Sequence, residues 1–180
     1  MLPPRIETER LQLRAPVGGD AVAIYDRYGR DPEVTRYLSW RTHTHLDDAR
    51  AYVATVMADW DDAIAPRRTW TITLRDDDTA VGQIGLLSQG HRMQMGYVLM
   101  RALWGHGYVP EAARALVGAA LSLPQVHRVW AFCDVENLAS ARVMEKAGMQ
   151  REGVLRRWAV HPNVSAVPRD VLAYAIVREV

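Results

Sequence analysis

Alternating polar and apolar residues predict a series of β-strands along this chain. Residues 10–14, Arg-Leu-Gln-Leu-Arg, show the pattern most simply, with every second side chain apolar as in a strand that buries one face. An Arg-Asp-Asp-Asp-Thr segment at 75–79 has the composition of a turn between two such strands. Strands are expected at residues 10–14, 68–74, 80–87, 93–100, 127–133, 149–158 and 171–178.

Apolar residues spaced three and four apart predict helices. The clearest case runs from Leu46 to Trp60, where the apolar positions share one face. Asp20 precedes another helical segment as a candidate N-cap, and Gly148 follows a third as a candidate left-handed C-cap. The main helices are expected at residues 21–28, 46–60, 110–121 and 138–147, with a brief additional one starting at Pro32.

The order of these elements indicates a mixed α/β (α+β) chain, in which antiparallel strands precede alternating strand and helix units. At 180 residues and 20.3 kDa the chain is expected to form a single domain, residues 1–180. It carries no repeat or low-complexity linker. We therefore expect one mixed, mostly antiparallel sheet flanked by helices.

Composition narrows the functional classes. With 49% hydrophobic and 24% charged residues the chain is typical of a globular protein, and it lacks both a long apolar run and the apolar core of a signal peptide. We therefore expect a cytoplasmic protein without a membrane partner. Its formal charge of +1 gives no case for nucleic-acid binding. Cys133 is the single cysteine, and His43 and His45 have no third ligand nearby in sequence, so no metal is expected.

Charge is unevenly distributed between the two halves. Residues 1–90 hold 11 basic and 14 acidic side chains, whereas residues 91–180 hold 11 basic and 7 acidic ones. Two interpretations stay open: statistical scatter, or an anionic ligand bound by the second half.

A glycine loop at 104–108, Trp-Gly-His-Gly-Tyr, lies between a predicted strand and a predicted helix. Glycines let the backbone turn sharply and approach a ligand, and the free N–H groups of a helix start favour negative charge. The loop is either a tight turn or a nest for a phosphate or pyrophosphate. The glycine spacing excludes the dinucleotide-binding and P-loop patterns.

Several motifs in order resemble the GNAT acetyltransferases, and within them the branch that acetylates the N-termini of ribosomal proteins. The likeness covers nearly the whole chain. The motifs lie at residues 8–14, 31–34, 37–38, 81–85, 96–99, 104–108, 111–112, 136–149, 152–156 and 169–172. The resemblance implies the GNAT fold: a twisted sheet of about seven strands with about four helices, in which the fourth and fifth strands, 93–100 and 127–133, splay apart.

The resemblance also implies acetyl-CoA as co-substrate. The glycine loop would hold the pyrophosphate, and the splayed strand would pair through its backbone with the pantetheine arm. His106 either adds charge or is an exposed loop side chain. The implied cofactor-binding residues are Tyr97, Val98, Leu99, Trp104, Gly105, His106, Gly107, Tyr108, Val109 and Asn137.

The catalytic groups are less complete. Ser140 matches a position where the branch has a serine near the CoA sulfur, so it is our candidate catalytic residue. The alternative interpretation is that Ser140 is a small residue in the first turn of a helix. Asn137 likewise has a second interpretation, as the N-cap of that helix. Gln94 and Met144 stand where relatives have a glutamate and a tyrosine. A base is not identified, and three candidates stay open: Asp134, His161 and Asp170.

Some aromatic residues are expected to pack in the core, and others are expected to contact the substrate. Trp60 and Trp70 are expected in the core, and Cys133 is expected to be a buried strand residue and not an acyl carrier. Tyr37, Trp40 and Trp158 lie in segments that line the acceptor groove in relatives, so they are candidate substrate contacts.

The sequence therefore predicts an acetyl-CoA-dependent N-acetyltransferase that acts on a primary amine by direct attack in a ternary complex. A protein N-terminal α-amine is the acceptor that the resemblance favours. Two alternatives remain: a small-molecule amine, such as an antibiotic or metabolite, and a degenerate acyl-CoA-binding protein without turnover. Both a monomer and a homodimer are compatible with the sequence.

Overall fold

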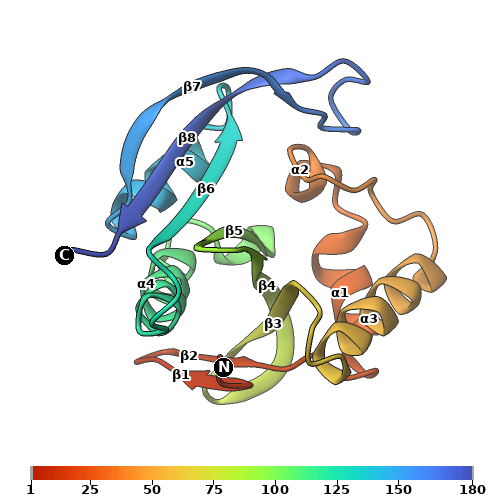
Figure 1. Cartoon of the computed structure of the whole chain (residues 1–180). Helices are drawn as coiled ribbons and strands as arrows, with labels where there is room; N and C mark the ends of the chain where they lie inside the picture. Colours follow the sequence, from red (N-terminus) through yellow and green to blue (C-terminus); the bar gives the residue numbers. More distant parts are fainter. Residues whose placement is uncertain (1, 180) are drawn as a thin grey trace.

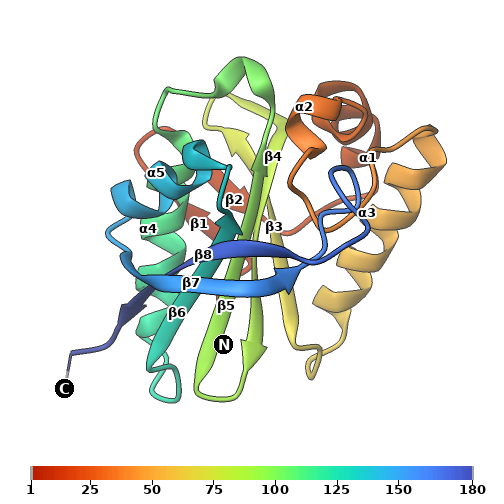
Figure 2. The same cartoon turned by 90° about the horizontal axis from the view of Figure 1, so that it is seen from above.

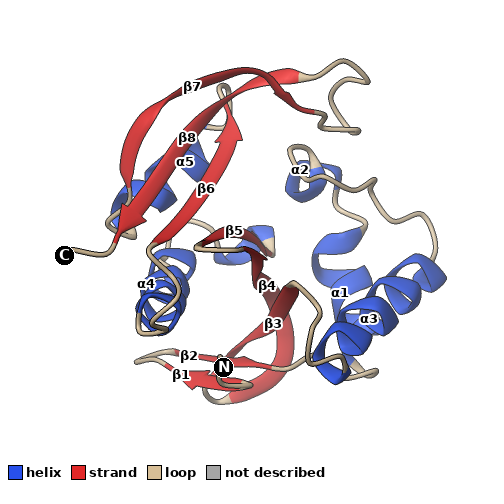
Figure 3. Cartoon of the chain, in the orientation of Figure 1, coloured by secondary structure: helices blue, strands red, loops and turns tan. Residues whose placement is uncertain are grey.

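The computed structural model describes residues 2–179, which form one eight-stranded sheet in the order β1-β2-β3-β4-β5-β6-β8-β7 (Figures 1 and 3). Its strands are β1 (Arg5–Glu7), β2 (Leu11–Arg14), β3 (Arg67–Leu74), β4 (Asp77–Gln89), β5 (Arg92–Leu99), β6 (Arg128–Asp134), β7 (Gln150–Ala159) and β8 (Arg169–Val177). All neighbours are antiparallel except β5 and β6. The expected mixed, mostly antiparallel sheet is confirmed.

Helices cover both faces of this sheet. They are α1 (Asp20–Ile24), which runs into a π-helical turn (Tyr25–Gly29), α2 (Pro32–Thr35), α3 (Leu46–Asp61), a short 3-10 helix (Arg101–Leu103), α4 (Tyr108–Leu121) and α5 (Leu138–Lys146). Figure 2 shows α1, α2 and α3 on one side of the central strands and α4 and α5 on the other. In the described part of the chain, no helix is both long and apolar enough to span a membrane.

Strands β5 and β6 separate along their length. They pair at three positions only, Arg92 with Arg128, Met93 with Val129 and Gln94 with Trp130, while β4 stays paired with β5 as far as Leu99. Figure 1 shows β6, β7 and β8 leaving the rest of the sheet at this point. The expected splay is therefore confirmed, and it leaves one edge of the second half of β5 unpaired by β6.

Two apolar clusters hold the layers together. The larger one lies between the sheet and α4 and α5; it includes the fully buried ring of Trp70 and Leu116 of α4. The smaller one joins α1 and α3 around Tyr28, which is also fully buried. The expectation that Trp70 packs in the core is confirmed, and the half-buried Trp60 packs edge-on against it.

Strand β1 was not expected. It has only three residues, and its pattern of exposed, partly exposed and exposed side chains carries too little hydrophobic signal to reveal a strand. It forms because β2 offers an open edge, where Ile6 pairs with Leu13. Strand β4 also starts earlier than expected: Leu74 pairs directly with Asp77, so the predicted turn at 75–79 shortens to residues 75–76.

Asp20 is not the N-cap of the first helix, contrary to the sequence-based expectation. Gly19 occupies that position without a side-chain cap, and Asp20 is the first helical residue. Its buried carboxylate instead accepts hydrogen bonds from the Arg14 guanidinium at 2.7 and 2.9 Å and from the Thr71 hydroxyl at 2.9 Å. A charged partner at the end of β2 competes better for a buried carboxylate than a helix end does.

Gly148 does end α5 in the left-handed region, with φ +91°. Its N–H donates to the Glu145 carbonyl, and the N–H of Met149 donates to the Met144 carbonyl. This is the Schellman pattern of helix termination. The expected C-cap is confirmed.

Candidate active site

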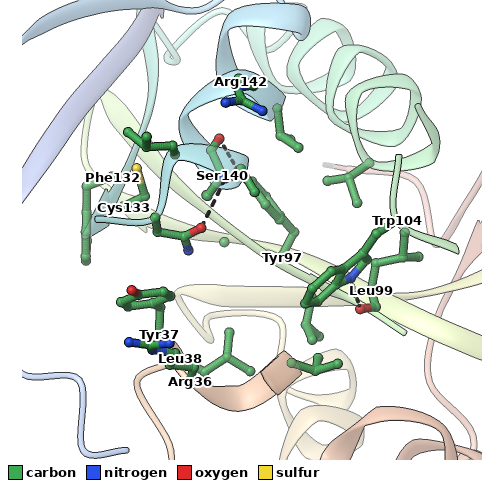
Figure 4. A pocket seen from close by; sticks show the side chains of 18 of the residues that line it. Arg36, Tyr37, Leu38, Tyr97, Leu99, Trp104, Phe132, Cys133, Ser140 and Arg142 are labelled. Atoms are coloured by element: carbon green, nitrogen blue, oxygen red, sulfur yellow. Dashed lines mark hydrogen bonds between the residues drawn. The ribbon is translucent and has the colours of Figure 1, made fainter. Parts of the chain in front are cut away.

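A cavity of about 730 Å³ follows the splay between β5 and β6 (Figure 4). The glycine loop and the start of α4 close one end, and the segment after α2 and the loop after β7 close the other. Most of the expected site residues line it. They are Tyr37, Tyr97, Val98, Leu99, Trp104, Gly105, Gly107, Tyr108, Val109, Asn137 and Ser140.

The glycine loop has the backbone of an anion nest. Gly105 and Gly107 adopt φ +83° and +79°, in the left-handed region where other residues are strained. Gly107 is the N-cap of α4 and has no side chain to satisfy the first N–H groups of that helix. These donors therefore stay available for a negatively charged ligand at the end of the cavity.

The side chain of His106 lies outside the cavity lining. It is exposed, and its Nδ1 lies 2.9 Å from the Trp104 carbonyl oxygen. The exposed-side-chain interpretation of His106 thus agrees with the structure. Trp104 fixes the other side of the loop, because its indole N–H donates to the Leu99 carbonyl at 2.8 Å (Figure 4).

The N-terminal strands hold this loop from outside. Arg10 donates to the His106 carbonyl at 2.9 Å, pairs with Glu111 of α4, and lies 4.5 Å from the centre of the Tyr108 ring. The Thr8 hydroxyl donates to Glu111 at 2.6 Å. Burial alone would raise the pKa of Glu111, but these hydrogen bonds and the Arg10 charge lower it. Two motifs that are far apart in the sequence, at 8–14 and 104–112, are therefore in direct contact.

Ser140 and Tyr97 form a hydroxyl pair across the splay. Tyr97 Oη lies 2.7 Å from Ser140 Oγ and donates to the Ser140 carbonyl oxygen at 3.1 Å (Figure 4). Burial raises the pKa of Tyr97 well above its ordinary value, so the phenol stays protonated at neutral pH. Asn137 caps α5 by accepting from the Ser140 N–H at 3.2 Å while it also lines the cavity, so both of its interpretations fit.

Cys133 lies beside this pair and is buried. Burial raises the pKa of its thiol to about 11, against a smaller opposing effect of the Ser140 hydroxyl. A thiol of that kind is a poor nucleophile at neutral pH. The structure therefore agrees with Cys133 as a buried strand residue.

The three aromatic residues expected to contact the acceptor lie in different places. Tyr37 lines the main cavity, and Trp40 lines a smaller adjoining one. Trp158 lines neither; its exposed ring instead packs edge-on against Trp130, with centroids 6.3 Å apart. The register of β7 decides which way the Trp158 side chain points, and the sequence pattern did not reveal that register.

Of the three candidate bases, His161 alone lines the cavity. Its side chain is 4% exposed, its ring nitrogens have no hydrogen-bond partner among the described residues, and its Nε2 lies 3.6 Å from Asp134. Asp134 is fully buried and accepts from Arg169 at 2.6 Å, and Asp170 accepts from the Arg157 N–H at 2.8 Å. Both carboxylates are thus occupied by protein donors.

Three cationic side chains at the cavity were not predicted as site residues from the sequence. Arg36, Arg142 and Lys146 all line it, and Figure 4 shows Arg142 of α5 close to Ser140. The excess of basic residues in the second half of the chain was the signal that could have identified Arg142 and Lys146. The interpretation of that excess as an anion-binding feature therefore fits the cavity.

Comparison with known proteins agrees with this geometry. The family profile described as an acetyltransferase (GNAT) domain matches residues 10–150. The uncharacterized N-acetyltransferase YoaA of Bacillus subtilis is 33% identical over 178 residues, covering 97% of each chain. A GNAT-family acetyltransferase structure from Bacillus anthracis superimposes with a TM-score of 0.82 at 30% identity, over 96% of this chain and 98% of that one.

A more distant structure shares the fold alone. RimL, a ribosomal L7/L12 alpha-N-protein acetyltransferase solved with coenzyme A, has a TM-score of 0.82 at 18% identity, over 96% of this chain and 97% of that one. The profile match and the full-length similarity to YoaA decide the classification. The chain belongs to the GNAT acetyltransferase family.

Proposed function

We propose that this protein transfers the acetyl group of acetyl-CoA to a primary amine, by direct attack of the amine in a ternary complex. The observation that carries the proposal is the juxtaposition, in one cavity, of an anion nest at Gly105 and Gly107 with the unpaired edge of β5. These are the two features needed to hold a pyrophosphate and an amide-bearing arm in one extended ligand.

The residues present fit acetyl-CoA. The cavity volume of about 730 Å³ lies within the range of about 300–1,000 Å³ found for ligand pockets. Backbone donors at 105–109 would hold the pyrophosphate, while Val98 and its neighbours would pair with the pantetheine amides. Arg142 and Lys146 line the same cavity and supply positive charge for phosphate groups. Acetyl-CoA itself supplies an activated acetyl thioester.

Ser140 is the proposed catalytic residue. The neutral amine nitrogen forms a bond to the thioester carbonyl carbon, and the carbon–sulfur bond breaks. The nitrogen then loses one proton and the thiolate takes up one proton, so the products are the acetylated amine and the thiol of CoA. The Ser140 hydroxyl donates a hydrogen bond to the departing sulfur once the Tyr97 phenol directs its own proton to Ser140 Oγ, 2.7 Å away, instead of to the Ser140 carbonyl. A free backbone N–H of β5 would stabilise the negative charge that develops on the carbonyl oxygen.

The proposal also covers which amine is acetylated and which residues contact it. Tyr37 and Trp40 line the two adjoining cavities and are retained as acceptor contacts. A protein N-terminal α-amine is favoured by the resemblance to the ribosomal-protein branch, and RimL is named as an alpha-N-protein acetyltransferase. A small-molecule amine remains the alternative acceptor.

The test is release of free CoA, followed with DTNB, over a panel of amines and peptides, together with calorimetric titration of CoA. Release with at least one amine supports the transferase. The rival candidate is a degenerate acyl-CoA-binding protein, favoured by Gln94 and Met144 at positions where relatives have a glutamate and a tyrosine. CoA binding without release for any acceptor would establish that rival.

A further inference from the structure

A second, smaller cavity of about 270 Å³ adjoins the main one. It lies on the sheet face covered by α3, whereas the Tyr97 phenol reaches α5 on the other face. The two cavities meet along shared lining residues, Leu38, Ser39, Gln94, Gly96, Tyr97 and Val98. A molecule in the second cavity therefore reaches the splay from the side opposite α5.

Strand register places two glycines side by side in the floor of this cavity. Thr69, Gly85 and Gly96 face one another across β3, β4 and β5. A Cβ on Gly85 would lie 3.0 Å from the Arg68 carbonyl oxygen, whereas a Cβ on Gly96 would meet no heavy atom within 4 Å. The space above Gly96 is thus open, and the two adjacent glycines make a shallow trough.

Aromatic rings bound the trough. The rings of Trp40 and Tyr52 lie 6.2 Å apart at an interplanar angle of 27°, and both line the cavity. Burial raises the pKa of Tyr52 to about 12, so the ring stays neutral at physiological pH. The two rings stack on each other and so form one aromatic wall, against which a flat apolar group can pack.

A buried amide lies one register position further along. Gln83 faces Thr71 and Val98, is 3% exposed, and lines the cavity. Its Nε2 has no hydrogen-bond partner among the described residues. Buried polar atoms are ordinarily hydrogen-bonded, and the terminal torsion of glutamine is soft, so this amide is a candidate donor to an oxygen of a ligand.

The charges in the lining of the second cavity disfavour acceptors that carry a second positive charge. Of the described residues that line the second cavity, Arg67 alone is charged, and its Nε donates to Asp59 at 2.6 Å. With no carboxylate in the lining, a second ammonium or guanidinium group placed there would be buried without a partner. Polyamines and lysine-like side chains are therefore disfavoured.

Resting on the proposed transferase function, we infer that the second cavity binds the side group of the acceptor, and that the acceptor is an α-amine with a flat apolar or aromatic side chain and a carbonyl oxygen that accepts from Gln83. The shared chemistry is an α-aminoacyl unit, either as a small amide or as the first residue of a peptide. At about 270 Å³ the cavity holds one side group and not a whole ligand.

The first experiment measures kcat/KM for phenylalanine amide, alanine amide, lysine amide and a pentapeptide that begins with phenylalanine. We expect lysine amide to be at least about tenfold poorer than phenylalanine amide. Preference for phenylalanine amide identifies a small acceptor, and a preference for the peptide identifies an N-terminus; both support the inference. Equal or better use of lysine amide overturns it.

The second experiment uses Gln83→Met, with Gln150→Met as the matched control at an exposed position outside both cavities. Loss of the amide donor should raise the acceptor KM about two- to tenfold without changing the KM for acetyl-CoA. Because an unpartnered buried donor is removed, the Tm of Gln83→Met should equal or exceed that of the wild type. A lower Tm with an unchanged acceptor KM would mean that Gln83 is structural.

Gln83→Glu provides a change of specificity that a structural role would not produce. A carboxylate in the trough should reduce the preference for phenylalanine amide over lysine amide, since it offers the second ammonium a partner. An unchanged preference counts against a contact between residue 83 and the side group.

The assay distinguishes an enzyme without this side-group preference from a protein that transfers no acetyl group. CoA release with alanine amide at the same rate as with phenylalanine amide leaves the transferase standing and overturns the inference. If no amine releases CoA, calorimetric binding of phenylalanine amide to the CoA-loaded protein still tests the cavity. Binding that weakens in Gln83→Met supports it, and the absence of binding overturns it.

Discussion

Arg10 and Glu111 form an ion pair of 2.6 Å that ties the N-terminal strands to the helix following the glycine loop. The same guanidinium donates to the His106 carbonyl inside that loop. The loop is thereby held on its outer side, so its amides are already oriented before a ligand binds. Preorganisation of this kind lowers the entropic cost of binding.

Arg10→Ala should weaken CoA binding although Arg10 does not line the cavity. Releasing the His106 carbonyl and Glu111 lets the loop relax, and we expect Kd to rise about three- to tenfold in calorimetric titrations. Arg5→Ala is the matched control, because Arg5 pairs only with the nearby, exposed Glu7. Equal affinities in both variants would show that the loop holds its shape without Arg10.

The same contact predicts a pH dependence of stability. The hydrogen bonds from Thr8 and Arg10 lower the folded-state pKa of Glu111 below its ordinary 4.5 despite burial. A depressed carboxyl pKa contributes stability above the unfolded-state pKa, and that contribution is lost as pH falls through the folded-state value. Glu111→Gln should therefore lose less unfolding free energy than the wild type between neutral pH and about pH 3 in denaturant titrations. Parallel pH curves would contradict this.

Gly107→Val should remove CoA binding while the protein still folds. Forcing a branched residue to φ +79° costs about 1–2 kcal/mol, and the side chain blocks approach to the nest. Gly118→Val introduces the same residue on the exposed face of α4 and should leave binding unchanged. Calorimetry and thermal unfolding measure the two effects, and unchanged affinity in Gly107→Val would disprove the nest.

Ser140→Ala and Tyr97→Phe should lower kcat in the same direction. Each removes one member of the 2.7 Å hydroxyl pair, so we expect about a two- to tenfold loss with little change in the KM for acetyl-CoA. Because the hydroxyls act together, the double variant should lose less than the product of the two single losses. Strictly multiplicative effects would mean that Tyr97 does not orient Ser140.

Cys133 should not carry an acetyl group. With the thiol pKa raised to about 11 by burial, the thiol stays protonated at neutral pH. Mass spectrometry after incubation with acetyl-CoA and without acceptor should show no acetylated Cys133. A stable adduct on Cys133 would replace direct attack by a two-step route.

The local sequence determined the elements and the family. Strict alternation identifies β2 because one buried face requires apolar residues at every second position, and glycines at 105, 107 and 148 identify the left-handed positions that other residues avoid. Sequence motifs in order were enough for the GNAT assignment. These features depend on neighbours along the chain, so a single sequence contains them.

Tertiary structure alone decided which distant residues meet. Arg10 and Glu111 are 101 residues apart, Asp20 accepts a hydrogen bond from Thr71, 51 residues away, and Trp40 rather than Trp158 lines a cavity. The trough beside Gln83 exists because the registers of β3, β4 and β5 place two glycines in one row. Such contacts follow from strand register and from the docking of helices on the sheet, which arise from packing of the whole chain and leave no periodic signal in any one segment.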